Sequence, residues 1–252
     1  MTPQEQIAAQ LLSTRSLPIS QAWLDRFVAT SSTAQPNVNV PISGLTRTAL
    51  FRVLASDFRE TLSTANRPSL LPSDVFDPTI QERRLQGVVP VQILDIEDIG
   101  SSLWSQVEAI ERVERGEAVR GREIVRTVNL EDGNQERDNP SNNASASANT
   151  NANNTTSNSS ASSSHGPHRL IVQDAAGTRA VAVEIRSVEG VAVDKTPIGA
   201  KLLLRNASVA RGMVLLTPET VTYLGGKIEA MDRAWREGRK ERLLSRLSEN
   251  QP

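Results

Sequence analysis

The run DIED carries acidic residues whose types and spacing could support metal chemistry. Asp95, Glu97 and Asp98 stand close together in it, and clustered carboxylates are the ligands that Mg²⁺ prefers. No further group of carboxylates or bases accompanies them, as a catalytic metal site would require. We therefore interpret these side chains as the solvent face of a strand.

The run HGPH offers the other candidate metal ligands. It contains His165 and His168, the 2 histidines of the chain, and the sequence has 0 cysteines that could complete a zinc site. The pair also stands beside a stretch that we expect to be disordered. We predict no metal site here.

The run LGGK, at positions 224–227, resembles a phosphate-binding turn because glycines before a helix can expose backbone amides to an anion. It lacks the longer loop of a phosphate-binding motif, and a tight turn between a strand and a helix explains the glycines better. We therefore expect a protein with no catalytic residues and no cofactor.

Composition and charge narrow the function classes. Lys and Arg number 28 against 29 Asp and Glu, so no basic field attracts a polyanion. Aromatic residues make up 3% of the chain, which leaves few rings for stacking bases. The absence of cysteine, of a long apolar run and of a secretory signal predicts an intracellular protein that does not span a membrane. A protein partner is favoured over bare nucleic acid.

Residues 1–66 predict three short helices that form a bundle. Apolar residues recur at helical spacing in the first helix (Ile7, Leu11, Leu12) and in the second, behind a Ser20 cap (Trp23, Leu24, Phe27, Val28). We expect a single third helix over 44–62, capped by Ser43 or Thr46, with Leu50, Val53, Leu54 and Phe58 on one face. A proline-punctuated connector, 67–87, follows.

Alternating apolar residues then predict strands. Val89, Val91 and Ile93 alternate, after which Leu94 and Ile96 take the opposite phase, and this slip indicates a β-bulge. Pairing partners occur only after residue 165, in HRLIVQD, TRAVAVEIRSV, AKLLLRNASV, GMVLLTP and TVTYLGG. About five strands of this length suit a small barrel. We assign residues 88–250 to this domain, with a closing helix over 227–249.

A long insertion interrupts the barrel at about residues 100–168. Its tract 139–164 has no aliphatic side chain larger than Ala and cannot bury enough apolar area to fold, so we expect disorder over 133–166. The insertion begins with a predicted helix in which Leu103, Trp104, Val107 and Ile110 share a face.

The run RGMVLLTPETVTYLGGKIEAM resembles the RecQ-mediated genome instability protein 1 family. Further stretches agree in the same order: AWLDRFV, ALFRVLASDFRETL, SLLPSDVFD, VQILDIEDI and PIGAKLLLRNASVARG. The resemblance implies an α+β fold, with a three-helix bundle before an OB-fold β-barrel that has an insertion after its first strand and a C-terminal helix.

The resemblance also implies a function. Members of the family act in the nucleus as non-catalytic scaffolds that bind DNA topoisomerase III, work with a RecQ-family helicase and promote dissolution of double Holliday junctions. DNA is then contacted mainly through the complex. The alternative is an OB-fold protein that binds single-stranded DNA directly, which would need an exposed aromatic platform with a basic rim.

The resemblance assigns Lys201, in GAKLLL, to the barrel face that contacts topoisomerase III. We expect an exposed charge at the end of a strand, so that Lys201→Glu would weaken binding and leave the melting temperature unchanged. The alternative is a solvated lysine without a partner. Trp104, with Leu103 and Val107, is the second predicted contact, and its alternative is a packing anchor on the chain's own barrel.

Overall fold

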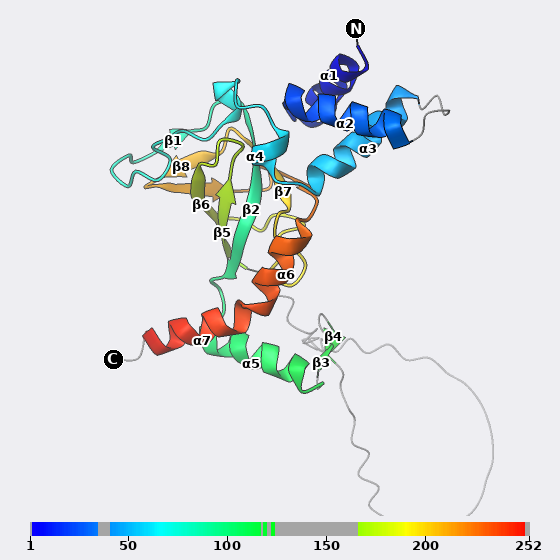
Figure 1. Ribbon diagram of the computed structural model, residues 1–252. Helices are drawn as coiled ribbons and strands as arrows, with labels where there is room; N and C mark the ends of the chain where they lie inside the picture. The colour runs from blue at the N-terminus through cyan, green and yellow to red at the C-terminus, as the bar shows by residue number, and fades with distance from the viewer. Residues whose placement is uncertain (1, 35–40, 117, 120–121, 124–165, 250–252) are drawn as a thin grey trace, which may run out of the picture.

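The computed structural model describes residues 2–34, 41–116, 118–119, 122–123 and 166–249 (Figure 1). His165 and the tract predicted to be disordered lie outside the described residues, except for Gly166 at its end. Helices at the N-terminus pack on one side of a β-barrel, and the C-terminal helices lie at its other end, beside the helix that opens the insertion. This arrangement confirms the predicted α+β fold.

The described residues of the N-terminal region form four α-helices: α1 (Pro3–Arg15), α2 (Gln21–Ala34), α3 (Ile42–Leu54) and the short α4 (Phe58–Thr61). Thr2 caps α1 in a capping box with Glu5, which satisfies amides that the first turn leaves free. Ile7 and Leu11 are buried on the inner face of α1. The predicted bundle is present, but its last helix is divided.

The prediction of one helix over 44–62 is wrong. The chain leaves the helix after Leu54. Asp57 then adopts an extended conformation, and its carboxylate caps α4 by accepting a hydrogen bond from the Arg59 amide. The Phe58 amide donates a hydrogen bond to Gln92 of the barrel, 3.0 Å away, so a contact distant in sequence replaces the next helical turn. The helix also begins earlier than expected, with Pro41 at its N-cap in place of Ser43 or Thr46.

The strands of the main sheet are β1 (Arg83–Arg84), β2 (Val88–Asp98), β5 (His168–Gln173), β6 (Arg179–Glu184), β7 (Lys201–Arg205), β8 (Ser208–Ala210), β9 (Met213–Leu216) and β10 (Val221–Gly225). Their order is β1-β8-β9-β6-β5-β2-β7-β10, with β6 and β9 parallel. Only residues 206–207 separate β7, which pairs with β2, from β8, which pairs with β9. The bent β7–β8 segment therefore closes the barrel. The small hairpin β3 (Ala118–Val119) and β4 (Arg122–Glu123) lies within the insertion.

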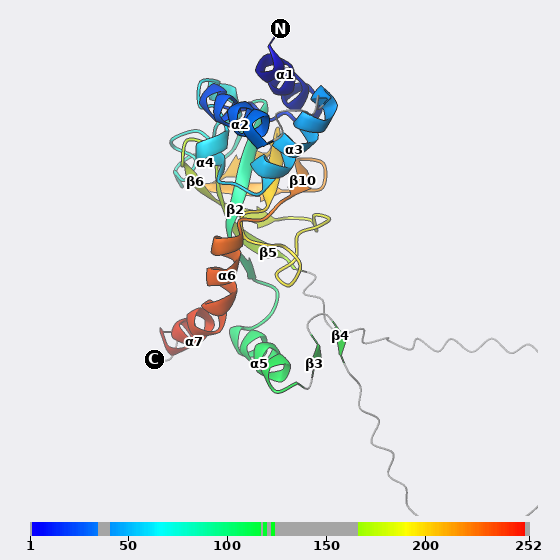
Figure 2. The same cartoon turned by 45° about the vertical axis from the view of Figure 1, so that its right-hand side comes forward.

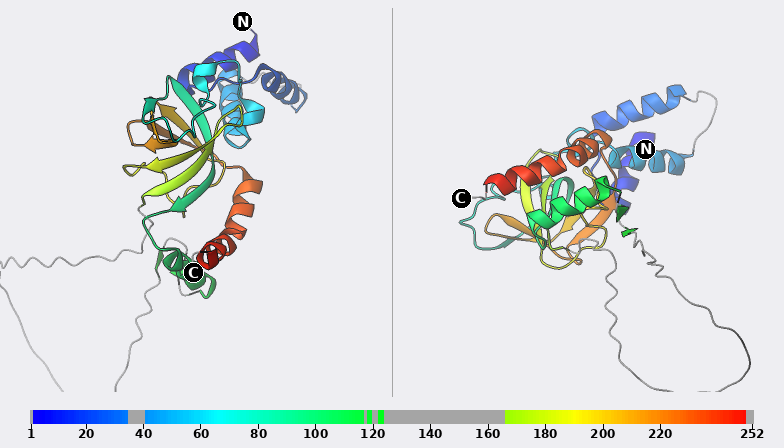
Figure 3. Two further views of the ribbon diagram at one scale, coloured as in Figure 1. Left: turned by 90° about the vertical axis from the view of Figure 1, so that its left-hand side faces the viewer. Right: turned by 90° about the horizontal axis from the view of Figure 1, so that it is seen from below.

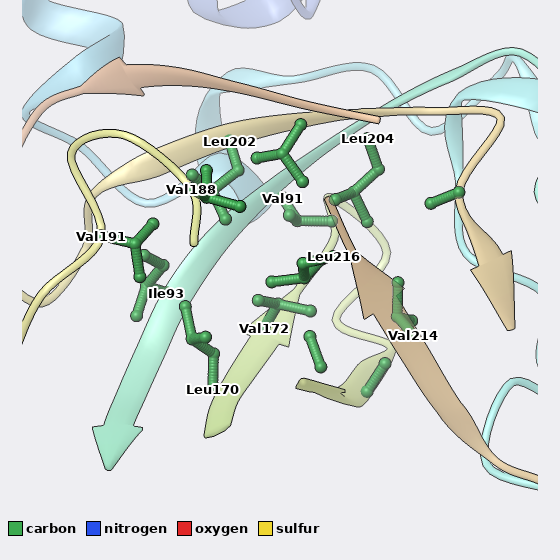
Figure 4. Packing of buried hydrophobic residues seen from close by; sticks show 14 of the residues in the cluster. Val91, Ile93, Leu170, Val172, Val188, Val191, Leu202, Leu204, Val214 and Leu216 are labelled. Atoms are coloured by element: carbon green, nitrogen blue, oxygen red, sulfur yellow. The ribbon is translucent and has the colours of Figure 1, made fainter. Parts of the chain in front are cut away.

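Strand β2 contains the predicted bulge. Ile93 pairs with Val172 and Asp95 with Ile171, so the register shifts by one residue between them. The shift brings Ile96 into the barrel core three residues after Ile93, which a regular strand would not allow. Figure 4 shows the apolar side chains that point toward one another inside the barrel, including Val91, Ile93, Leu170, Val172, Leu202, Leu204, Val214 and Leu216.

The outer face of β2 and β7 is covered by the helical region. Leu203 of β7 belongs to the core of the helices, whereas its neighbours Leu202 and Leu204 belong to the barrel core. Val88 of β2 also packs against the helical core. The run KLLLR is apolar without alternation because both of its faces are buried.

The C-terminal region contains α6 (Glu229–Glu237) and α7 (Arg239–Glu249), and the insertion begins with α5 (Leu103–Glu114). The prediction of one closing helix over 227–249 is therefore wrong, because the helix breaks at Gly238. Figures 2 and 3 show α6 descending from the barrel and α7 turning to run beneath its lower end. Among the described residues, no helix has the length and apolar character needed to cross a membrane.

The docking of the helices on the barrel predicts a position that cannot accept a side chain. A Cβ on Gly226 would lie 2.4 Å from the Leu54 carbonyl oxygen of α3, and its φ of +89° is left-handed. We expect Gly226→Ala to lower the free energy of unfolding by about 3 kcal/mol or more in urea denaturation.

Gly116→Ala is the matched control, because Gly116 has a similar φ of +73° but open space around it. This variant should lose only about 1–2 kcal/mol, because the left-handed backbone alone opposes the new side chain. Equal losses in the two variants would contradict the close approach at Gly226.

Candidate partner-binding surface

The structure places Trp104 on the outside of α5. Its side chain is 67% exposed, so its interpretation as a packing anchor on the barrel is wrong. Val107, one turn further along the helix, is buried, and Leu103 is half-buried. Val107 thus supports the helix, and its role as a direct partner contact stays a prediction, as does that of Trp104.

The turn between β2 and α5 is fixed by Asp98. One carboxylate oxygen accepts hydrogen bonds from the amides of Gly100 and Ser101, and the other accepts from the Ser101 hydroxyl. Ser102 caps α5 at the Ser105 amide, 3.1 Å away. The direction in which α5 leaves the barrel is therefore set within a few residues of the strand.

The other carboxylates of the DIED run also bind side chains of the protein. Asp95 accepts a hydrogen bond from the Trp235 indole at 2.5 Å, and Glu97 forms ion pairs with Arg169 and Arg246. They hold the C-terminal helices on β2, so the interpretation as a plain solvent face is incomplete. Among the residues that the structure describes, no group of three or more His, Cys, Asp and Glu is placed to hold a metal ion.

His168 is a buried structural residue. Its Nδ1 lies 2.5 Å from a carboxylate oxygen of Glu184, and that side chain also accepts hydrogen bonds from the amides of His168 and Val188. In the LGGK run, Gly225 and Gly226 both have positive φ and form the turn from β10 into α6. Lys227 pairs with Glu229 and Asp232, and this supports the structural interpretation of the run.

A cavity of about 280 Å³ opens between the end of β2, α5 and the C-terminal helices. Its walls include Ile99 and Leu103 beside the indole of Trp235, with arginines of α7 at its margin. Ile99 is 48% exposed. We call Ile99, Leu103 and Trp104 together the Trp104 surface. It is an exposed apolar surface at the base of the insertion, the kind of site that marks a protein interface.

The expectation that Lys201 is exposed is wrong, since its exposed fraction is 0%. Its Nζ donates hydrogen bonds to the Ser56 carbonyl at 2.7 Å and to Gln92 Oε1 at 2.9 Å, and it lies 4.6 Å from the centroid of the Phe58 ring. The side chain points to the outer face of β7, which the helical region covers. Lys201 therefore joins the two regions of the chain and has no surface to offer a partner.

Gln92 completes this polar cluster beneath the helices. Its Oε1 accepts from Lys201 and from the Phe58 amide, while its Nε2 donates to Asp57 and to Gln173. A buried amide with all these bonds satisfied stabilises one arrangement of strands and helices. Burial lowers the pKa of Lys201 to about 7, and the nearby Asp57 carboxylate opposes this shift.

The structure also bears on direct DNA binding. The exposed aromatic side chains in the described residues are Phe51 on α3, Phe76 in the connector and Trp104 on α5. None lies on a strand of the barrel, so the described part of the barrel presents no aromatic platform for bases.

The fold and this surface define a class of protein, an OB-fold subunit with a helical domain at its N-terminus. Residues 71–239 match the family model described as the N-terminal OB-fold domain of RMI1, and residues 11–61 match the model of the RMI1 N-terminal helical domain. The chain belongs to the RMI1 family. It is 27% identical over 181 residues to RecQ-mediated genome instability protein 1 of Schizosaccharomyces pombe, covering 72% of this chain and 71% of that relative. The resemblance inferred from the sequence is confirmed.

The buried lysine predicts a pH dependence of stability. Folded Lys201 loses its proton near pH 7, whereas the ordinary lysine pKa of 10.5 applies after unfolding. Between these values the unfolded chain binds more protons, so the free energy of unfolding rises with pH. Relative to Lys201→Met, the wild type should gain up to about 1.4 kcal/mol per pH unit. Urea denaturation of both proteins from pH 7 to pH 10 measures this difference, and parallel curves would contradict it.

The effect expected of Lys201→Glu changes accordingly. A carboxylate at this position would face the carbonyl oxygen of Ser56 and Oε1 of Gln92, which are both acceptors. We expect a loss of about 3–5 kcal/mol of stability, because a buried charge would lack a donor. This prediction replaces the expectation of a nearly unchanged melting temperature, which rested on an exposed Lys201.

Proposed function

We propose that this protein is a non-catalytic scaffold and regulatory subunit that binds DNA topoisomerase III and a RecQ-family helicase in the nucleus. In this role it promotes decatenation and the dissolution of double Holliday junctions. Family membership supports the coarser part of the proposal, a RecQ-associated role in genome stability. In this proposal the partners bind most of the DNA. A net charge of −1 agrees with this, because the protein has no excess of positive charge to attract the phosphate backbone.

The observation that carries topoisomerase binding is the Trp104 surface. An exposed tryptophan is costly to leave in water and is enriched among the residues that dominate binding energy at interfaces. It stands on a helix whose orientation is fixed by Asp98 and Ser102. A rigid apolar anchor loses little entropy on binding, which favours a stable complex.

The test compares the truncation of two exposed aromatic side chains. Trp104→Ala should weaken binding to purified topoisomerase III by about 10-fold or more, since loss of an interface hot spot costs about 2 kcal/mol. Phe51→Ala is the matched control, because Phe51 is 73% exposed but lies on α3. Both variants should keep the wild-type free energy of unfolding. Titration calorimetry measures the affinity, and a decatenation assay measures the consequence for activity.

Two outcomes would contradict the proposal. Wild-type protein that does not bind topoisomerase III would remove the proposed partner. Loss of binding in Phe51→Ala but not in Trp104→Ala would move the interface to the helical region. A parallel titration with single-stranded DNA alone tests the alternative of direct DNA binding.

A further inference from the structure

Helix α5 is held at a second place, far in sequence from its attachment to β2. Lys240 of α7 lies between two carboxylates of α5, with its Nζ 2.6 Å from Glu114 Oε2 and 3.4 Å from Glu111 Oε1. Both glutamates stand in the last turns of α5, whereas Asp98 and Ser102 hold its first turn. The helix is therefore fixed at both ends.

The contact between α5 and α7 also has an apolar part. Val107 of α5 and Leu243 of α7 are 3% and 7% exposed, yet neither belongs to the barrel core or the helical core. Arg239 approaches Gln106 Oε1 at 3.5 Å, and the Nε2 of Gln106 donates to the Asp98 carbonyl. Figure 3 shows the two helices side by side below the barrel.

Helix α7 is in turn fastened to the barrel. Arg246 forms an ion pair with Glu97 of β2 at 2.7 Å. Arg242 donates a hydrogen bond to the Trp235 carbonyl at the end of α6, and the Trp235 indole donates to Asp95 of β2. Helices α5 and α7 are therefore both anchored to strand β2.

These contacts matter because α5 is weak by itself. A helix of 12 residues is marginally stable in water without tertiary packing. Lys240 and its glutamates are partly exposed, so each ion pair contributes little to global stability. Reversing the lysine charge would place three carboxylates together, which would separate the C-terminal half of α5 from α7.

We infer that α7 is the positioning element of the Trp104 surface, with Lys240 as the positioning residue that holds α5 in its binding orientation. The inference deepens the proposed function and rests on it. Lys240 itself need not touch the partner. Lys240 affects affinity by keeping α5 folded and in place, and the stability of α5 can be measured in the free protein.

The test uses Lys240→Glu in the full chain. Amide hydrogen exchange in α5 should accelerate about 10-fold or more, while the strands of the barrel keep their protection. Affinity for topoisomerase III should fall about 3-fold to 10-fold. The triple variant Lys240→Glu, Glu111→Lys, Glu114→Lys restores opposite charges with the positions exchanged and should recover both measurements.

Arg233→Glu is the matched control. Arg233 is exposed on α6, and in the described part of the chain it forms no ion pair with α5, so the same change of charge should leave exchange and affinity as in the wild type. Unchanged exchange in Lys240→Glu would overturn the inference, as would a triple variant that fails to recover.

Failure of the inference is distinguishable from failure of the proposed function. Faster exchange in α5 with unchanged topoisomerase affinity would overturn the positioning role while the proposed partner stands. Absence of binding by the wild type would overturn the proposed partner, and the exchange experiment would still decide whether Lys240 holds α5.

Discussion

The structure depends on the contact between Gln92 and Lys201 on the outer face of neighbouring strands. These residues pair across β2 and β7, and each turns away from the barrel core toward the helices. Ser56, Asp57 and Phe58 supply the matching acceptors, donor and aromatic ring at the point where α3 gives way to α4. A polar cluster with this many mutual bonds accepts one docking geometry. The helical region and the barrel therefore behave as one body.

Local sequence patterns predicted much of this fold. Alternation located the long strand β2, and the phase slip between Ile93 and Ile96 located its bulge, because both depend on the period of a strand. The continuous helix predicted over 44–62 was wrong because its break involves a contact with Gln92, which is distant in sequence. The exposure of Lys201 was wrong for the same reason. The break within 227–249 lies at Gly238, a local signal in the sequence that the prediction missed. The uninterrupted apolar run that follows it was the one local indication that both faces of β7 are covered.

The candidate site was predicted in part. The sequence placed Trp104 on a helix at the start of the insertion, and the helix exists, but periodicity assigned the indole to the same face as Val107. Burial of one and exposure of the other depends on α7, which lies more than a hundred residues later in the chain. The structural role of the DIED carboxylates could not be predicted from the local sequence either, because their partners Trp235 and Arg246 lie in the C-terminal helices.

The ends of the insertion stand directly opposite each other in the sheet. Asp98, where β2 ends, is the register partner of His168, where β5 begins. A segment whose attachment points are already adjacent can grow or shrink without pulling the barrel apart, and its closure entropy changes only with the logarithm of its length. The part of the insertion beyond α5 can therefore change in length and composition at little cost to the barrel. A fluorescent or affinity domain could be grafted there while the strands on either side keep their pairing.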